Sequence, residues 1–145
     1  AEALLPSGGR AESLALLSGG RPAVLWRATA TGRARVLVFD AGLTLLGARA
    51  VPLDAGAGLA GVEGRVVLAY RAQRDGRVQV VAQDALTGEV SLRAPLPAGF
   101  DPTAITAGAG GSILVAGHRL GDGAVLLSQW AADGTLLLQV RRFPG

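Results

Sequence analysis

The residues of this chain that could do acid–base or nucleophilic chemistry are few. His118 is the only histidine among 145 residues and there is no cysteine, which excludes a histidine-clustered metal site and a cysteine nucleophile. A serine–histidine–aspartate relay would have to combine His118 with Ser112 or Ser128 and with Asp122. No Gly-x-Ser-x-Gly turn is present to activate a serine. The sequence therefore predicts no catalytic, cofactor-binding or metal-binding residues, and no cofactor.

The aspartates stand at turn positions. Asp75 and Asp122 each precede a glycine between two apolar runs, where an aspartate side chain bonds the nearby backbone. Asp40 and Asp84 both follow an apolar run, and no Asp-x-Asp-x-Asp-Gly calcium loop is present. We expect these carboxylates to hold turns rather than ions.

One set of side chains could form a binding surface. Arg27, Arg71 and His118 each end an equivalent apolar run, and Trp26 and Tyr70 stand one position earlier in their runs. Arrayed around an axis, the three polar residues would line one rim facing an anion, and the aromatic pair would offer a stacking surface for sugars or peptides. The alternatives are solvated strand ends that protect sheet edges and aromatic packing between sheets.

The composition is that of one folded domain, residues 1–145, with many tight turns. Half of the residues are apolar, 17% are charged and 22 are glycine. The net charge is only +3 and the arginines are scattered along the sequence, so we expect no nucleic-acid partner. The apolar runs are far shorter than the roughly 20 residues of a membrane helix, so no membrane insertion is expected.

These residues belong to three copies of one pattern of about 45 residues. A shift of 44 positions places "RPAVLWRATATGRARVLVFDA", from Arg21, on "RVVLAYRAQRDGRVQVVAQDA", from Arg65. A shift of 47 places the second copy on "SILVAGHRLGDGAVLLSQWAA", from Ser112, and "DALTGEVSLRAPLP" on "AADGTLLLQVRRFP". The turn of the first copy is one residue shorter. The approximate units are 6–52, 53–97 and 98–144.

Each unit is predicted to contain four strands. In the third unit the strands are "TAITAGA", "SILVAGH", "AVLLSQW" and "TLLLQVRRF", separated by the turns "GG", "LGDG" and "AADG". The hairpin between the second and third strands keeps a glycine in all three units, at Gly32, Gly76 and Gly123, because a twist-matched turn needs positive φ there. The near-continuous apolar runs are typical of strands covered on both faces. The chain is predicted to be all-β.

The third unit resembles repeats of bacterial β-propellers of the delta-sixty type, which run Gly-x-(Ile/Val)-x-Val-Ala-Gly and later Asp-Gly before a closing strand. The residues that carry this resemblance are Gly111, Ile113, Val115, Ala116, Gly117, Asp133, Gly134 and Leu136. The middle unit's "AQDALTGEVSL" is similar to a turn of quinoprotein-type propeller blades. The matching residues there are Asp84, Ala85, Thr87, Gly88 and Val90.

The resemblance implies three four-stranded antiparallel blades of a β-propeller. The alternative is a closed three-fold β-trefoil or β-prism, supported by the count of three and by "SQW" at Ser128, which loosely resembles the Gln-x-Trp of ricin-type lectins. Propellers close with about four to eight blades. Three blades would leave the flat faces of both end sheets open and apolar. We therefore expect a fragment of a longer propeller, or two chains that close a six-bladed ring.

The function that follows from this pattern is a non-enzymatic propeller module, a scaffold or binding surface for a protein or glycan partner. The possible binding rim is Arg27, Arg71, His118, Trp26 and Tyr70. One alternative is part of a propeller hydrolase, lyase or quinoprotein whose catalytic groups lie outside these residues. Another is a sugar-binding β-trefoil. The resemblance implies an extracellular or periplasmic location, and further blades or a homodimer as partners.

Overall fold

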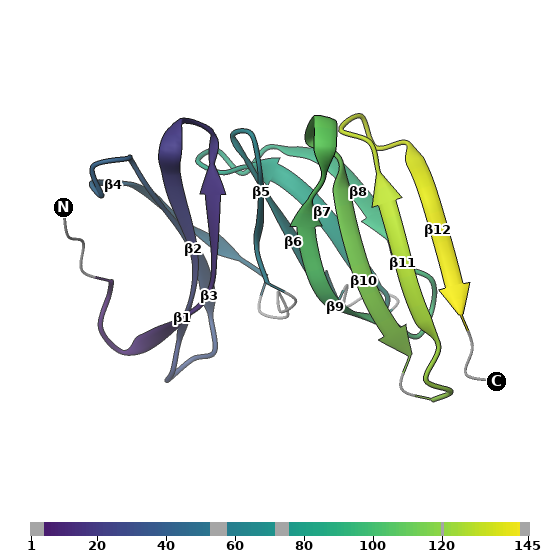
Figure 1. Ribbon diagram of the computed structural model, residues 1–145. Coiled ribbons are helices and arrows are strands. Elements are labelled where there is room, and N and C mark those ends of the chain that lie inside the picture. The colour runs from purple at the N-terminus through teal and green to yellow at the C-terminus, as the bar shows by residue number, and fades with distance from the viewer. Residues whose placement is uncertain (1–4, 53–57, 72–75, 120, 143–145) are drawn as a thin grey trace.

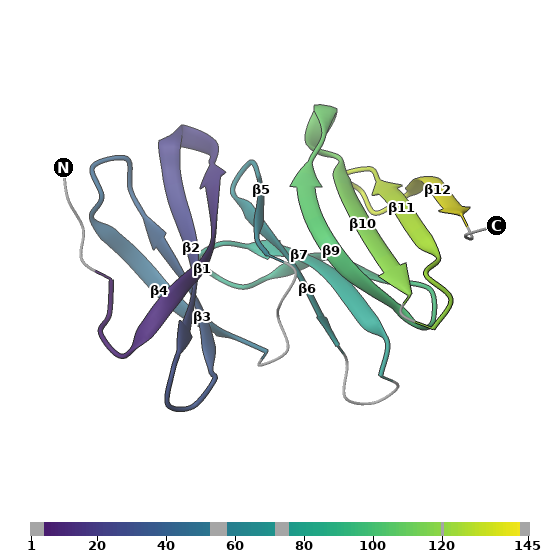
Figure 2. The same cartoon turned by 60° about the horizontal axis from the view of Figure 1, so that its bottom comes forward.

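The computed structural model describes residues 5–52, 58–71, 76–119 and 121–142. Within these ranges the chain forms three four-stranded antiparallel sheets that stand one after another in chain order (Figures 1 and 2). The two helical segments in the same ranges are three-residue 3-10 turns, and no helix there has the length and hydropathy of a membrane span. The all-β, blade-like prediction is confirmed.

We call the sheets blades 1, 2 and 3. Blade 1 contains β1 (Gly9–Leu17), β2 (Arg21–Ala28), β3 (Ala34–Phe39) and β4 (Leu45–Val51). Blade 2 contains β5 (Ala60–Val62), β6 (Arg65–Arg71), β7 (Val78–Asp84) and β8 (Val90–Pro95). Blade 3 contains β9 (Phe100–Ala107), β10 (Ile113–Arg119), β11 (Val125–Trp130) and β12 (Leu136–Arg142).

The first strands of the blades lie together. Strand β1 contacts β5, and β5 contacts β9, while the other strands of each blade follow outward in chain order. The described strands pair only within their own blade. A closed trefoil barrel would need strands that pair between units, so the trefoil alternative is wrong. A prism would pack each sheet against both others, whereas the described cores join only blade 1 to blade 2 and blade 2 to blade 3. Separate sheets with adjoining inner strands are the arrangement of propeller blades.

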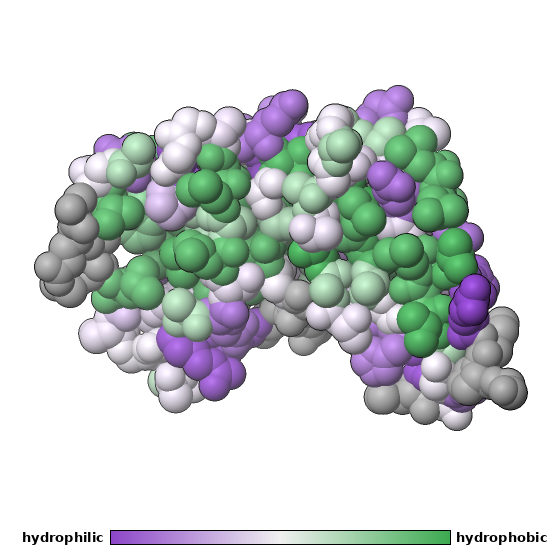
Figure 3. All heavy atoms as spheres, in the orientation of Figure 1, coloured by the Kyte–Doolittle hydropathy of each residue, from purple (hydrophilic) through white to green (hydrophobic). Residues whose placement is uncertain are grey.

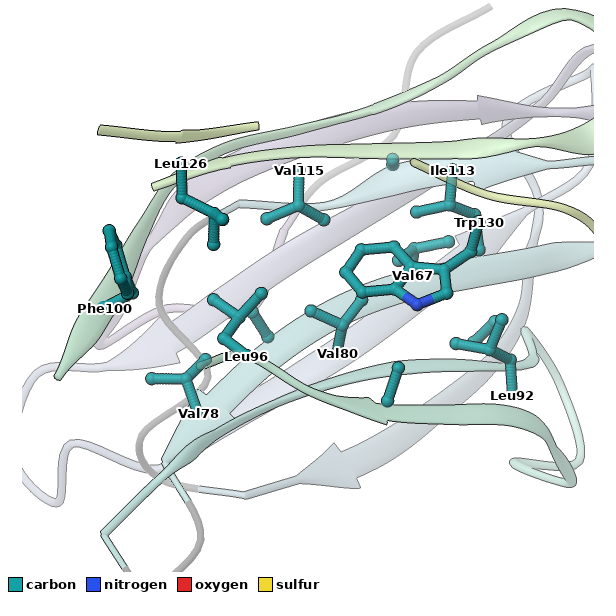
Figure 4. Close-up of a cluster of buried hydrophobic side chains, with 14 of the residues drawn as sticks. Val67, Val78, Val80, Leu92, Leu96, Phe100, Ile113, Val115, Leu126 and Trp130 are labelled. Atoms are coloured by element: carbon teal, nitrogen blue, oxygen red, sulfur yellow. The ribbon is translucent and has the colours of Figure 1, made fainter. Parts of the chain in front are cut away.

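Each blade packs through both of its faces, because successive side chains of a strand point to opposite sides. We call the face toward the next blade the forward face and the other the back face. Between blades 2 and 3, Val67 and Val80 on the forward face of blade 2 meet Val115, Leu126 and Trp130 on the back face of blade 3 (Figure 4). Every one of these five side chains is buried.

A second core joins blades 1 and 2 in the same way. Leu25 and Val36 on the forward face of blade 1 pack with Val66 and Leu68 on the back face of blade 2. Val66 and Val67 are neighbours in sequence, yet they belong to different cores. The near-continuous apolar runs are therefore explained by burial on both sides of the sheet, as predicted.

A β-bulge recurs where the third strand meets the fourth. The register shifts between Val38 and Phe39, between Ala82 and Gln83, and between Gln129 and Trp130. In each case one residue of the fourth strand is left without a direct partner. This bulge re-aims the fourth strand at the same point of all three blades.

The bulge exposes an error in the alignment of the fourth strands. The pairings equate Leu92, opposite Ala82, with Leu138, opposite Gln129, whereas a shift of 47 places Leu92 on Gln139. The reason is turn length. In blade 3 the Ala131 N–H bonds the Thr135 carbonyl, four residues on, whereas the corresponding bond in blade 2 spans five residues from Asp84 to Glu89. The blade 3 turn is thus as short as that of blade 1.

The hairpin glycines adopt the predicted conformation. Gly32, Gly76 and Gly123 have φ values of 68°, 69° and 70°. The turn between the first and second strands of each blade has a similar requirement, which glycine meets in blades 1 and 3: φ is 76° at Gly19 and 66° at Gly110. In blade 2 the same place is held by Glu63, with φ of 57°. A side chain with a β-carbon is strained in this region.

We expect Glu63→Gly to stabilise the protein. The left-handed conformation destabilises a residue with a β-carbon by about 1–2 kcal/mol, and glycine removes this strain. Glycine also gives the unfolded chain more conformational entropy, which offsets about 0.5–1 kcal/mol of the gain. The expected gain is therefore about 0.5–1 kcal/mol, measured by urea unfolding. The converse variant Gly110→Glu, where nothing lies within 4 Å of an added β-carbon, should lose a similar amount. A loss of stability in Glu63→Gly would contradict this account.

Candidate binding surfaces

Arg27 and Arg71 lie at the same place of neighbouring blades and make the same bond. The Nη1 of Arg27 donates to the Gly32 carbonyl at 2.8 Å, and the Nη1 of Arg71 donates to the Gly76 carbonyl at 2.7 Å. Each arginine thus ties the end of the second strand to the hairpin that follows it. The side chain is part of the turn, which the sequence repeat alone did not indicate.

Both arginines also hold a carboxylate from a first strand. The Nε of Arg27 donates to Glu12 Oε1 at 2.7 Å within blade 1. The Nη2 of Arg71 donates to Asp101 Oδ1, which lies on β9, so this ion pair joins blade 2 to blade 3. The Arg71 side chain is 47% exposed, so solvent weakens the pair.

His118 holds the equivalent place in blade 3. It stands opposite Asp101 in the register of β10 and β9, and its Nδ1 atom is buried without a hydrogen-bond partner in the described part of the chain. The next residue, Arg119, binds both oxygens of Asp122 in the following hairpin and lies over the Phe100 ring, 4.9 Å from its centroid. The Arg119 hydrogen bond lowers the pKa of Asp122 to about 2.

Trp26 and Tyr70 lie in the packing of the sheets. The Trp26 ring is 6% exposed and rests on the backbone of Gly9, where an added β-carbon would come within 2.5 Å of it. Tyr70 packs against the core between blades 1 and 2, and its hydroxyl accepts a hydrogen bond from Arg93. The structure therefore separates the aromatic pair from the three rim residues. A ligand-stacking role for the pair remains a prediction.

The aspartates hold turns. Asp40 Oδ1 accepts the Thr44 N–H at 2.8 Å. Asp84 Oδ1 accepts the N–H groups of Leu86 and Thr87, and these bonds lower the pKa of Asp84, with the larger effect from Thr87. Asp75 lies outside the described residues. No group of three or more histidine, cysteine, aspartate or glutamate side chains within the described ranges is placed to hold a metal ion.

The two edges of the blades carry opposite charge. We call the edge with the hairpins β2–β3, β6–β7 and β10–β11, which is the lower edge in Figure 1, the basic rim. Its described arginines are Arg10, Arg27, Arg33, Arg35, Arg71, Arg77, Arg119, Arg141 and Arg142, against the carboxylates Glu12, Asp101 and Asp122. We call the opposite edge the acidic rim. It carries Asp40, Glu63, Asp84, Glu89 and Asp133, against Arg21 and Arg65.

The expectation that the arginines are scattered is therefore wrong for the folded chain. Antiparallel strands bring the end of the second strand, the start of the third and the start of the first to one edge. Arginines that lie far apart in sequence, such as Arg10 and Arg142, then share a rim. The signal was present in the sequence as arginines that flank the predicted hairpins.

Blade 3 presents an apolar forward face that no described residue of another blade covers; we call it the open face. Figure 3 shows hydrophobic residues gathered over β11 and β12 on this side. Four of the side chains are between 39% and 56% exposed. Its apolar residues are Leu114, Ala116, Val125, Leu127, Leu138 and Val140, and Gln129 lies among them, opposite Leu114 and Leu138.

The same repeat positions are buried in blade 2. Each apolar residue of the open face has an apolar counterpart there, and all of the counterparts lie in the core between blades 2 and 3. They are Val67, Ala69, Val78, Val80, Leu92 and Ala94. The open face thus has the chemistry of an interior surface.

The other end of the molecule differs. On the back face of blade 1, Val24, Trp26, Leu37 and Phe39 form a buried cluster, none of them more than 8% exposed. The back face of blade 1 is therefore only partly open: this cluster is buried, whereas Leu14 and Leu16, opposite Val24 and Pro22 on the same face, are 69% and 68% exposed. The cluster is buried because its aromatic side chains are large and pack against the start of β1, where Gly9 leaves room for the Trp26 ring.

Arg49 makes a contact between blades 1 and 2 that was not predicted from the sequence. It lies on β4, and its Nη1 donates to Gln83 Oε1 of blade 2 at 3.1 Å. Burial lowers the pKa of Arg49, while the charge of Asp84 acts in the opposite direction. Gly88 approaches the Arg49 side chain so closely that an added β-carbon would lie 2.9 Å from its Cδ. Arg49 thus joins the outer part of blade 1 to blade 2.

No family model matches the chain, and no curated protein sequence matches it. A solved quinoprotein alcohol dehydrogenase-like protein from Bacteroides thetaiotaomicron is similar over 90% of this chain, with a TM-score of 0.60 and 16% identity. A protein of unknown function from Bacteroides caccae is similar over 94%, with a TM-score of 0.51 and 17% identity. This chain spans 33% of the first protein and 47% of the second. At these identities the similarity shows the fold alone, and the blade-like arrangement of the three sheets agrees with it.

We expect Arg71→Met to destabilise the protein by about 1 kcal/mol, because it removes the bond to the Gly76 carbonyl and leaves Asp101 without its ion pair. Urea unfolding measures the change. Arg33→Met is the matched control on the same rim, since the Arg33 guanidinium makes no hydrogen bond within the described ranges. If both variants unfold like the parent, the Arg71 bonds contribute nothing to stability.

Proposed function

We propose that this chain is a non-enzymatic propeller-type module that binds a protein partner through the open face of blade 3. The observation that carries the proposal is that the forward faces of blades 2 and 3 have equivalent apolar residues but differ in exposure. The residues at these positions are buried by the next blade in blade 2 and stand open in blade 3, as Val80 and Leu127 do. Exposed apolar patches of this kind mark interaction sites.

The proposed partner surface is a sheet face like the back faces of blades 2 and 3. Those faces meet the equivalent positions with side chains such as Leu68, Val115 and Leu126. Full burial of a valine or leucine side chain contributes about 1.5–3 kcal/mol. Covering the four half-exposed side chains of the open face would contribute several kcal/mol before the cost of association. Further blades or a second copy of this chain would supply such a face.

A protein partner is better supported than a glycan. Sugar sites usually place an exposed aromatic ring against the sugar, and the described tryptophan and phenylalanine side chains are all buried. The absence of an enzymatic role is likewise part of the proposal. It is supported by the use of Asp84 and Arg71 in turns and blade contacts rather than around a cavity. A propeller enzyme would need catalytic groups from elsewhere.

The chain itself is the probe for this proposal. We expect it to run larger than a monomer in size exclusion with light scattering, or to bind an apolar dye such as ANS, because the apolar side chains of the open face are exposed to water. Leu127→Glu should return a monomer and reduce dye binding. Val90→Glu is the matched control, because Val90 is 42% exposed on β8 of the middle blade, away from both end sheets, whereas Leu127 is 39% exposed.

Circular dichroism should show that both variants keep the fold of the parent, since each replaces an exposed side chain. A parent chain that is a sharp, dye-silent monomer would overturn the proposal. Equal effects of the two variants would also overturn it, because the response would then not be specific to the open face.

A further inference from the structure

The separation of charge between the two rims offers a second surface, distinct from the open face. Nine described arginines and three carboxylates gather on the basic rim, whereas two arginines and five carboxylates lie on the acidic rim. An anionic partner is therefore attracted to one edge of the blades and repelled from the other. The open face lies on the side of blade 3 and is apolar, so the two surfaces have different chemistry.

The basic rim already shows which anion it accepts. Every described carboxylate on it is held by an arginine: Glu12 by Arg27, Asp101 by the Arg71 of the neighbouring blade, and Asp122 by Arg119. The planar guanidinium group suits the two oxygens of a carboxylate. These pairs come from three blades and differ in position, so arginines of the rim hold carboxylates in more than one arrangement.

Further arginines on this rim have no partner of this kind. Arg33, Arg35 and Arg142 are exposed, and their guanidinium groups make no hydrogen bond or ion pair within the described part of the chain. They lie near the hairpin of blade 1 and at the end of β12 in blade 3. Donors at both ends of the rim fit an extended ligand that carries several negative charges.

The described residues of the basic rim include no exposed aromatic ring on which a ligand could stack. Bases of single-stranded nucleic acids and many sugars are held by exposed aromatic rings. Trp26 and Tyr70, which directly precede Arg27 and Arg71, pack between or against the sheets. Recognition at this rim therefore rests on charge and on hydrogen bonds from arginine.

We propose that the basic rim binds an acidic polypeptide segment, an extended chain with several aspartate or glutamate side chains that run from blade 1 toward blade 3. The carboxylates of the segment would take the place beside Arg33, Arg35 and Arg142 that Glu12, Asp101 and Asp122 take beside their own arginines. The proposal does not depend on what covers the open face.

A labelled oligoglutamate peptide tests the proposal by fluorescence anisotropy. We expect binding that weakens as salt rises through the physiological range, because exposed charges are screened over about 8–10 Å. The double variant Arg33→Gln/Arg142→Gln should weaken binding about fivefold or more. Its matched control is Arg21→Gln/Arg65→Gln, which removes the same charge from the acidic rim and should leave the affinity within about twofold.

Three results would overturn the proposal: no binding at low salt, equal loss in the two double variants, or tighter binding of a DNA duplex or of a sulfated polysaccharide than of oligoglutamate at equal salt. Leu127→Ser, which adds no charge on the face that carries Arg142, should bind the peptide as the parent does. A chain that stays monomeric but binds the peptide at the basic rim would refute the open-face proposal alone, and a chain that associates but ignores the peptide would refute this one alone.

Discussion

The structure depends on burial of both faces of every sheet. Neighbouring residues of one strand, such as Val66 and Val67, enter different cores, so a single blade removed from its neighbours would expose apolar side chains on both sides. Polar contacts also join the blades, among them Arg49 with Gln83, the Leu59 N–H with Ser13 Oγ, and Arg71 with Asp101. Packing therefore supplies the stability, and these polar contacts fix how one blade sits on the next.

A repeat that buries both faces creates the same problem at each end, and the two ends meet it differently. At blade 1 the back face carries Trp26 and Phe39, whose large side chains lie buried over the sheet. At blade 3 the forward face carries Val125 and Leu127, which are too small to cover one another and stay exposed. The two ends thus differ at these positions, although Leu14 and Leu16 leave part of the back face of blade 1 exposed, and blade 3 is where the proposed partner binds.

The fold could be predicted because its turns have strict requirements. Gly32, Gly76 and Gly123 mark hairpins that only positive φ can close, and their spacing sets the repeat. The register of the last strand could not be predicted. Residues Leu136, Leu137 and Leu138 are all apolar, so a shift by one residue leaves the pattern unchanged, although it moves each side chain to the other face. The opposite charges of the two rims were not predicted either, because residues from distant parts of the sequence come together on one edge only once the strands are paired.

The turns explain part of the charge on each rim. Turns on the acidic rim present N–H groups, and carboxylates such as Asp84 and Asp133 accept hydrogen bonds from them. Hairpins on the basic rim present carbonyl groups, to which Arg27 and Arg71 donate. Folding alone therefore accounts for these residues, and it would leave the rims oppositely charged in a protein with no anionic partner. The exposed arginines Arg33, Arg35 and Arg142 go beyond this requirement, since no described turn uses their guanidinium groups. Their charge is the part of the basic rim on which the proposed binding of an acidic peptide rests.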